Sequence, residues 1–360
     1  MSPKSRFCVF CGNIPLDKNR EHVLPQWLIE LSGPAKRVVN FGMNPMTGQL
    51  PRFDWSSFAF PSCRQCNERY STLEAEVKGL IESLLARDPI KASNYVSLLD
   101  WLDKVRVGLW LGYSYLHKNP LKISPTFHID SRIGKKDRML AIYTIETNRR
   151  GLNTYGAETL CFQYQPSCFS LNINNTYILN MSWDFMCSAR CGFPFPRNAV
   201  IDLDNEGMLE CSDLLMTHKV KHPIFRKRLI KPSIHLYEPI IQITDFPSDG
   251  WLNGKLIPDS GSKGVIYRQW DDQVEVINDL NALIDNGEVK GNHCRPLAEI
   301  IAQTYERQLE SCAAYEYRSI DKALIAAAKA RNALFRKQNN AYKNAFLSLL
   351  KMRKKVDVPT

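Results

Sequence analysis

The chain has 360 residues, of which 44% are hydrophobic and 23% are charged, and this composition excludes an intrinsically disordered protein. The formal net charge of +10 favours polyanionic partners, with nucleic acid the first candidate and an anionic membrane the second. No run of 18 apolar residues occurs and residues 1–13 lack the apolar segment of a signal peptide, so we expect a cytoplasmic protein without a membrane span.

The predicted elements change character along the chain and indicate an α+β fold. The length favours two or three domains. We divide the chain into an N-terminal module at 1–90, called the zinc module because it contains two CxxC pairs of the kind that bind zinc, a helical connector at 91–125, a β-rich part at 126–290 and a basic helical region at 291–360.

In the zinc module, residues 32–55 are rich in Gly, Pro and Asn and predict loop with short strands. From Leu73 to Leu85 apolar residues recur at helical spacing, and Asp88-Pro89 marks the end of that helix. Residues 92–118 predict a second helix that is apolar on more than one side, and we therefore expect it to lie buried between other elements.

Between about 138 and 280 the chain predicts short strands, because β-branched and aromatic residues alternate with turn residues. The strand candidates are residues 139–146, 160–165, 168–173, 176–185, 199–203, 234–244 and 273–277. From 296 to the end the pattern is helical, with about six more basic than acidic residues. These helices could follow a nucleic-acid backbone, pair with an acidic partner protein, or form a dimer through their apolar residues.

Two CxxC pairs predict one structural zinc ion, bound by Cys8, Cys11, Cys63 and Cys66. Gly12 can take the positive φ that such a turn needs after its second ligand. The 51 residues between the pairs suit a treble-clef-like module with an inserted hairpin. One alternative is that the four cysteines have this spacing by chance and bind no metal. The other is a redox CxxC motif, which is disfavoured because no βαβ pattern flanks either pair. Eleven cysteines, an odd number, do not favour a disulfide framework in a cytoplasmic chain.

The sequence Arg-Glu-His-Val-Leu-Pro at 20–25 lies between the two pairs, and Asn67 directly follows the last cysteine. Residues 6–80 therefore resemble the HNH, or ββα-metal, nuclease family. The arrangement of an acid-His pair between two zinc-binding CxxC pairs, with Asn after the fourth cysteine, is similar to that of phage Holliday-junction resolvases. Nothing in the remainder of the chain carries a resemblance.

The resemblance implies that His22 is the general base and that Glu21 and Asn67 bind a catalytic magnesium or manganese ion. Histidine can take a proton near neutral pH, and magnesium prefers hard oxygen ligands. The second histidine of the family motif is absent. Glu74, seven residues after Asn67 and on the same helix face, is either a third metal ligand or an exposed helical glutamate.

The implied activity is hydrolysis of phosphodiester bonds in DNA, in a family common in bacterial phage defence and restriction. The alternative is a non-catalytic zinc module that binds nucleic acid or a protein partner. In that case His22 is a structural histidine and Asn67 only a helix N-cap. A homo-oligomer, or a nuclease subunit of a larger complex, is a third possibility.

Three further features have two interpretations each. Lysines and arginines between 219 and 231 form either a phosphate-binding patch or a solvated face; they are Lys219, Lys221, Arg226, Lys227, Arg228 and Lys231. Cys187 and Cys191, which follow Met186 with CxxxC spacing, suggest reduced core thiols rather than a second metal site. His218 and His222 suggest a surface loop rather than ligands on one helix face.

Overall fold

A computed structural model gives the structure of the chain. It describes residues 7–15, 17, 19–40, 47, 49, 52–116, 129–131, 133–134, 137–145, 148, 150–182, 187, 195–202, 208–215, 232–239, 266–270, 273–286, 294–314 and 322–356. The basic patch at 219–231, His218, His222, Met186 and Cys191 lie outside these residues.

The N-terminal module is built on a two-stranded antiparallel sheet followed by a long helix. Strand β1 (Asn19–His22) pairs antiparallel with β4 (Ala59–Ser62), and helix α2 (Arg64–Ala86) follows one residue later. Helix α1 (Gln26–Leu31), strands β2 (Val38–Asn40) and β3 (Arg52–Asp54) and the 3-10 helix η1 (Trp55–Ser57) lie between the two strands. Strands β2 and β3 pair antiparallel, which is the inserted hairpin that the spacing of the cysteines predicts.

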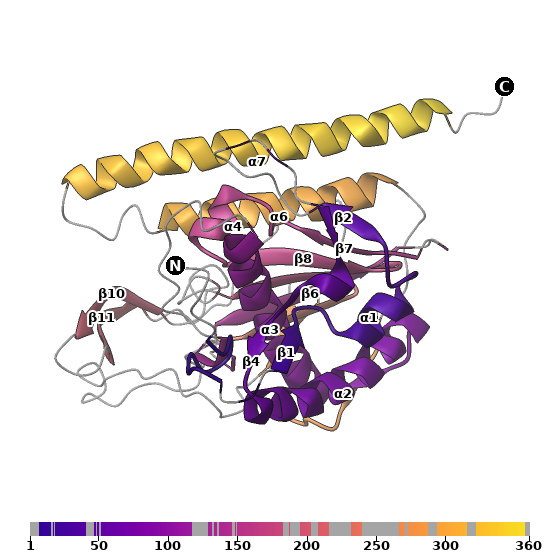
Figure 1. Ribbon diagram of the computed structural model, residues 1–360. Helices are drawn as coiled ribbons and strands as arrows, with labels where there is room; N and C mark the ends of the chain where they lie inside the picture. Colours follow the sequence, from indigo (N-terminus) through magenta and orange to yellow (C-terminus); the bar gives the residue numbers. More distant parts are fainter. Residues whose placement is uncertain are drawn as a thin grey trace.

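Helix α3 (Ala92–Leu116) confirms the helix that was predicted at 92–118, and it lies at the centre of the molecule (Figure 1). It is apolar on several sides, and Trp101, Leu102, Val105 and Leu109 are completely buried. It packs against α2 on one side and against the central sheet on the other. The burial on several sides explains why its sequence lacks a clear polar face.

The central sheet has seven strands in the order β14-β13-β12-β6-β9-β8-β7, and every pair of neighbours is antiparallel. In chain order, its strands are β6 (Arg138–Thr144), β7 (Leu152–Tyr155), β8 (Cys168–Ile173), β9 (Thr176–Ser182), β12 (Ile234–Glu238), β13 (Tyr267–Trp270) and β14 (Gln273–Val276). Two small sheets accompany it, formed by β10 (Phe195–Asp202) with β11 (Met208–Leu215), and by β5 (Ile90–Lys91) with β15 (Leu283–Ile284). The short 3-10 helix η2 (Ile129–Ser131) precedes the sheet.

The two faces of the sheet bury different cores, because successive side chains of a strand point to opposite faces. Leu140 and Ile142 of β6 belong to the core that includes α3 and the N-terminal module. Met139 and Ala141 belong to a second core, which includes Ile300 of helix α6 (Cys294–Ala314). Helix α7 (Lys322–Val356) packs on α6 and forms the outermost layer, drawn in yellow in Figure 1. The layers therefore run from the N-terminal module through α3, the sheet and α6 to α7.

A buried network of charged side chains joins α3 to the sheet. The Arg138 guanidinium of β6 donates hydrogen bonds to Asp103 of α3 at 2.9 Å and to Glu238 of β12 at 2.6 Å. Arg106 of α3 pairs with Asp103 and donates to the backbone carbonyl of Pro166 at 2.6 Å. Since these charges are almost completely buried, their mutual pairing offsets the cost of removing them from water.

One predicted strand is wrong. Residues 160–165 were expected to be extended, but Leu160–Tyr164 form helix α4. The Thr159 side chain accepts a hydrogen bond from the backbone N–H of Phe162 at 3.0 Å and caps the helix start. This local hydrogen bond, together with contacts of α4 with α6 and α7, outweighs the strand preference of the aromatic residues.

The α+β fold class is confirmed, with the N-terminal cysteine pairs, the antiparallel sheet and the C-terminal helices all present. Among the described residues, no helix is both long enough and apolar enough to cross a membrane.

Candidate functional site

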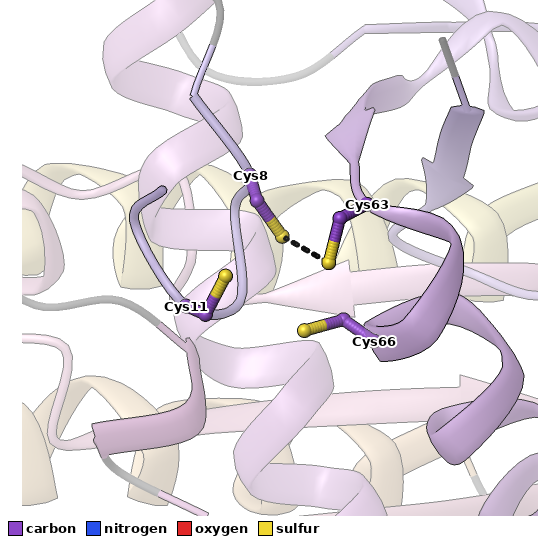
Figure 2. A group of neighbouring side chains, drawn as sticks. All are labelled: Cys8, Cys11, Cys63 and Cys66. Atoms are coloured by element: carbon purple, nitrogen blue, oxygen red, sulfur yellow. Dashed lines mark hydrogen bonds between the residues drawn. The ribbon is translucent and has the colours of Figure 1, made fainter. Parts of the chain in front are cut away.

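The four predicted zinc ligands converge into one group. The sulfur atoms of Cys8, Cys11, Cys63 and Cys66 all lie within 4.8 Å of one another, and Figure 2 shows them pointing toward a common centre. The Sγ atoms of Cys8 and Cys63 are 3.8 Å apart. Sulfurs at the corners of a tetrahedron, about 2.3 Å from a central zinc ion, would be about 3.8 Å apart. This cysteine cluster therefore could hold a metal ion such as zinc.

Local backbone geometry explains how each pair of cysteines forms its turn. Gly12 has a φ of 77°, and its N–H donates to the carbonyl of Cys8 at 2.9 Å, which closes the first turn. Cys63 is the N-cap residue of α2, and Cys66 lies in the first turn of that helix. The N–H of Val9 donates to the carbonyl of Pro61 at 2.9 Å and holds the first turn against β4.

The environment of the cluster favours thiolate at Cys8. Burial acts to raise the pKa of the Cys8 thiol, but hydrogen bonds with the backbone of Cys11, Cys63 and Phe10 bring it below its ordinary value. Burial raises the pKa of Cys66 well above its ordinary value. A metal ion would favour the deprotonated form of all four thiols, since thiolate is the ligand form.

A cleft beside the cluster brings together all the residues for which catalytic roles were predicted. It has a volume of about 270 Å³, and its lining includes Glu21 and His22 from β1 and Asn67 and Glu74 from α2. These residues come from two segments that are about 45 positions apart in the sequence, so the β1–β4 strand pair and helix α2, which follows it, create the site. The other lining residues are Arg20, Pro25, Gln26, Trp27 and Ser71.

His22 has a fixed orientation within the cleft. Its Nε2 lies 2.9 Å from the backbone carbonyl oxygen of Ser56 in η1. Because a carbonyl can only accept, Nε2 must carry the hydrogen, and in the neutral ring Nδ1 is then the basic nitrogen. Strand β1 supports this arrangement, since His22 pairs with Ala59 of β4.

Asn67 and Glu74 lie on the same face of α2, as their spacing of seven predicts. The interpretation of Asn67 as an N-cap is wrong, because Cys63 is the cap and the backbone N–H of Asn67 donates to the Cys63 carbonyl at 3.1 Å. Within the described part of the chain, the Asn67 side chain makes no hydrogen bond, so its amide oxygen is available to a ligand in the cleft.

Lys104 of α3 is part of this site, although no sequence pattern singled it out. Its ammonium group pairs with Oε1 of Glu21 and with Oε1 of Glu74, and its side chain is only 1% exposed. One lysine thus holds together two carboxylates that lie 53 positions apart on different elements. The link could not be read from the sequence, because α3 reaches the site only through tertiary packing.

The Glu21–Lys104–Glu74 group carries one net negative charge if all three are ionised. Burial raises the pKa of the Glu21 carboxyl above its ordinary value, Lys104 acts to lower it, and the nearby charge of Glu74 raises it again. The net shift is upward, so Lys104 does not fully compensate for burial and for the second carboxylate. A further cation in the cleft would be attracted by the remaining negative charge.

The cleft is also lined by Arg20, Gln26, Trp27 and Ser71, for which no function was predicted. Arg20 is exposed and directly precedes the Glu-His pair, which is the one local signal that could have drawn attention to it. Of the CxxxC feature, Cys187 is described and is 2% exposed, as expected of a core thiol.

Comparison with protein-family models, with curated proteins and with solved structures finds no match to this chain.

Proposed function

We propose that this chain is a metal-dependent endonuclease of the HNH type that hydrolyses phosphodiester bonds in DNA. The observation that supports the proposal best is the cleft, where Glu21, His22, Asn67 and Glu74 meet beside the cysteine cluster. A module that only binds nucleic acid has no need for an oriented histidine next to two carboxylates. Restriction of foreign DNA or phage defence is a setting in which such an activity is useful.

In this proposal zinc at the cysteine cluster is structural. The first cysteine pair is hydrogen-bonded to β4 through Val9, and the second pair starts α2. Zinc with four thiolate ligands has no open coordination position and therefore does no chemistry itself. Its role is to fix β1 and β4 against the start of α2, and thereby to hold His22 opposite Asn67.

Glu21, Asn67 and Glu74 would hold a magnesium or manganese ion, since carboxylate and amide oxygens suit these hard cations. Such an ion, when bound, stabilises the negative charge that develops on the phosphate and the leaving oxygen. Glu21 and Glu74 each pair with Lys104 through Oε1. Within the described residues, the second oxygen of each carboxylate makes no hydrogen bond or ion pair and could bind a cation.

His22 would act as the general base. Its Nε2 donates to the Ser56 carbonyl, which leaves Nδ1 to take a proton from the attacking water. The imidazolium that forms remains hydrogen-bonded to that carbonyl, which keeps the ring in its orientation. Arg20, exposed at the same cleft, would bind a phosphate oxygen of the substrate.

The test is cleavage by the His22→Ala protein. Wild-type protein should cut duplex, branched or single-stranded DNA when magnesium or manganese is added, and His22→Ala should lose about 10²- to 10⁴-fold of the rate, the usual contribution of a general base. The variant should keep its zinc and its DNA affinity, measured by metal analysis and by fluorescence anisotropy. Glu74→Gln, which changes a proposed ligand of the catalytic ion, should also slow cleavage, and Glu82→Gln, at an exposed position on α2 outside the cleft, serves as its control.

Two outcomes would contradict the proposal. Equal cleavage by wild type and His22→Ala would exclude His22 as the base. Binding of DNA by the wild type, with no cleavage of any of the three DNA forms by either protein, would favour the non-catalytic zinc module. Addition of imidazole to His22→Ala offers a further check, since a small base that enters the vacated space should restore part of the lost rate.

A further inference from the structure

Helix α7 carries an unusual share of the charge of this protein. It contains ten of the 47 lysines and arginines and none of the 37 aspartates and glutamates. The remaining 37 basic residues are therefore matched by 37 acidic ones, and the formal net charge of +10 resides on this one helix. At about 1.5 Å per residue, its 35 residues extend over roughly 52 Å.

The basic residues of α7 are not distributed evenly around the helix. Lys322, Lys329 and Arg336 follow one another at intervals of seven residues, which places them on one side of the helix about 10.5 Å apart. They and Lys337 are exposed, and within the described part of the chain none of the four has an acidic partner. We call these four residues the basic face of α7.

The side of α7 next to the basic face is used for packing. Phe335, Asn332 and Asn339 are buried, and the Asn339 amide donates to the carbonyl of Tyr305 on α6 at 3.1 Å. Arg331 lies over the ring of Tyr164, and Lys343 pairs with Glu306 of α6 at 2.7 Å. The helix is thus firmly attached, with its basic face directed away from the protein.

We propose that the basic face of α7 binds the phosphate backbone of duplex DNA at a place separate from the cleft. A uniformly charged polymer can satisfy a row of cations without matching their spacing, because DNA carries a charge about every 1.7 Å along its axis. Ala326, Ala330 and Ala333 are exposed between the basic residues, and such small side chains let a helix approach a backbone closely. The inference rests on the proposed function in taking DNA as the polyanion.

Three other binding partners fit the described surface less well. A second copy of the helix would need apolar residues every three or four positions, but among residues 322–345 and 348, whose side chains the structure describes, the exposed large apolar ones are Leu324 and Leu334, ten positions apart. A membrane surface would also require a continuous apolar side. An acidic protein would have to present carboxylates along the same 10.5 Å intervals.

The position of α7 in the fold defines its role. The N-terminal module with the cleft and α7 are the outer layers on opposite sides of the sheet, with α3 and α6 between them (Figure 1). The segment of DNA on α7 is therefore not the segment in the cleft. Helix α7 would anchor a neighbouring stretch or a second arm of the substrate, and raise the local concentration of DNA at the cleft.

The experiment measures binding rather than cleavage. A fluorescein-labelled duplex of 20 base pairs, without added divalent cations, is titrated with wild type and with the Lys329→Gln/Arg336→Gln/Lys337→Gln protein at several salt concentrations. If the three residues contact three phosphates, the triple variant should bind about 100-fold more weakly near 0.1 M salt. Its slope of log affinity against log salt should fall by about 2.7.

A matched variant removes the same number of charges elsewhere. Lys36, Lys78 and Lys91 are exposed on the N-terminal module and α2–β5 region, and their triple replacement by Gln should change the affinity and the salt slope far less. Equal effects of the two triple variants would overturn the proposal, because binding would then depend only on net charge.

Two further measurements test whether α7 binds something other than DNA. If the α7 variant binds DNA normally but changes from dimer to monomer in sedimentation, α7 is a dimer interface. If it binds DNA normally but no longer binds phosphatidylserine vesicles, α7 is a membrane surface. Either result would overturn the proposal. DNA binding that depends on α7 in a protein that never cleaves DNA would leave this inference standing and the proposed function refuted.

Discussion

Replacement of Lys104 by methionine tests the Glu21–Lys104–Glu74 group most directly. Methionine keeps an unbranched apolar stem, so the main change is the loss of one ammonium group from between two carboxylates. The side chains of Glu21 and Glu74 are 10% and 19% exposed, compared with 1% for Lys104. Glu74 has access to water and can turn toward it, whereas Glu21 would be left buried without a counter-charge.

Removal of one partner from a buried ion pair usually costs about 3–5 kcal/mol. Because both carboxylates retain some exposure, we expect a value near 3 kcal/mol, or a fall in melting temperature of roughly 4 °C for a chain of 360 residues. The assay is thermal and urea unfolding of zinc-loaded protein without added magnesium. Lys78→Met, at an exposed position of α2, is the matched control and should cost no more than about 0.5 kcal/mol.

The loss of stability in the Lys104→Met protein should depend on pH, and its direction follows from the pKa of Glu21. In the variant nothing lowers the pKa of Glu21, which therefore rises further above the ordinary glutamate value of 4.5. Between 4.5 and the raised pKa of the folded state, the folded protein holds a proton that the unfolded chain has released. The free energy of unfolding must then fall as pH rises through this range. The difference from wild type should be smaller at pH 5 than at pH 8.

A double variant separates charge from packing. Glu21→Gln combined with Lys104→Met removes the uncompensated charge and should be more stable than Lys104→Met alone. The reasoning would be refuted if Lys104→Met were as stable as the Lys78→Met control. It would also be refuted if the two single changes added without any coupling.

The remaining predictions concern the cysteine cluster and two glycines. Cys66→Ser should lower the zinc content, measured by metal analysis, from one ion per chain toward zero. It should also reduce the melting temperature, measured by calorimetry, and unchanged stability would exclude a structural metal. Gly112→Ala should destabilise the protein by about 1–3 kcal/mol, because an added Cβ would lie 2.0 Å from the Phe58 ring. Gly79→Ala, where a Cβ meets nothing within 4 Å, should instead stabilise α2 by roughly 0.5–1 kcal/mol. Changes of the same sign at both glycines in urea unfolding would contradict this interpretation.

Local signals were sufficient for the long helices α2, α3, α6 and α7, for five of the seven strands of the central sheet and for the cysteine cluster, but they missed helix α1 and strands β7 and β13. Helix α2 follows from its apolar spacing, and each cysteine pair is a short turn that needs only its own residues, while the bond between Val9 and Pro61 brings the two pairs together. Helix α4 was mistaken for a strand because the cap at Thr159 was not weighed against the aromatic residues that follow. One hydrogen bond and tertiary contacts determine that these residues are helical and not extended.

The site itself was only partly predictable. Glu21, His22 and Asn67 could be identified from their order along the chain relative to the cysteines, and the cleft includes all three. Lys104 could not be identified, since it comes from another helix and resembles any lysine of an apolar segment. Likewise the sequence left three interpretations of the C-terminal helices open, because their exposed face depends on how α7 packs against α6.

The burial of α3 also has a consequence for how the chain is made. At a synthesis rate of about 5–20 residues per second, α3 leaves the ribosome seconds before β6 and β9, the strands of the central sheet that pack on it. During that interval Asp103 and Arg106 of α3 do not yet have the partners that these strands supply, Arg138 and Asn180. The nascent N-terminal module therefore exposes this side of α3 to water until the sheet has formed.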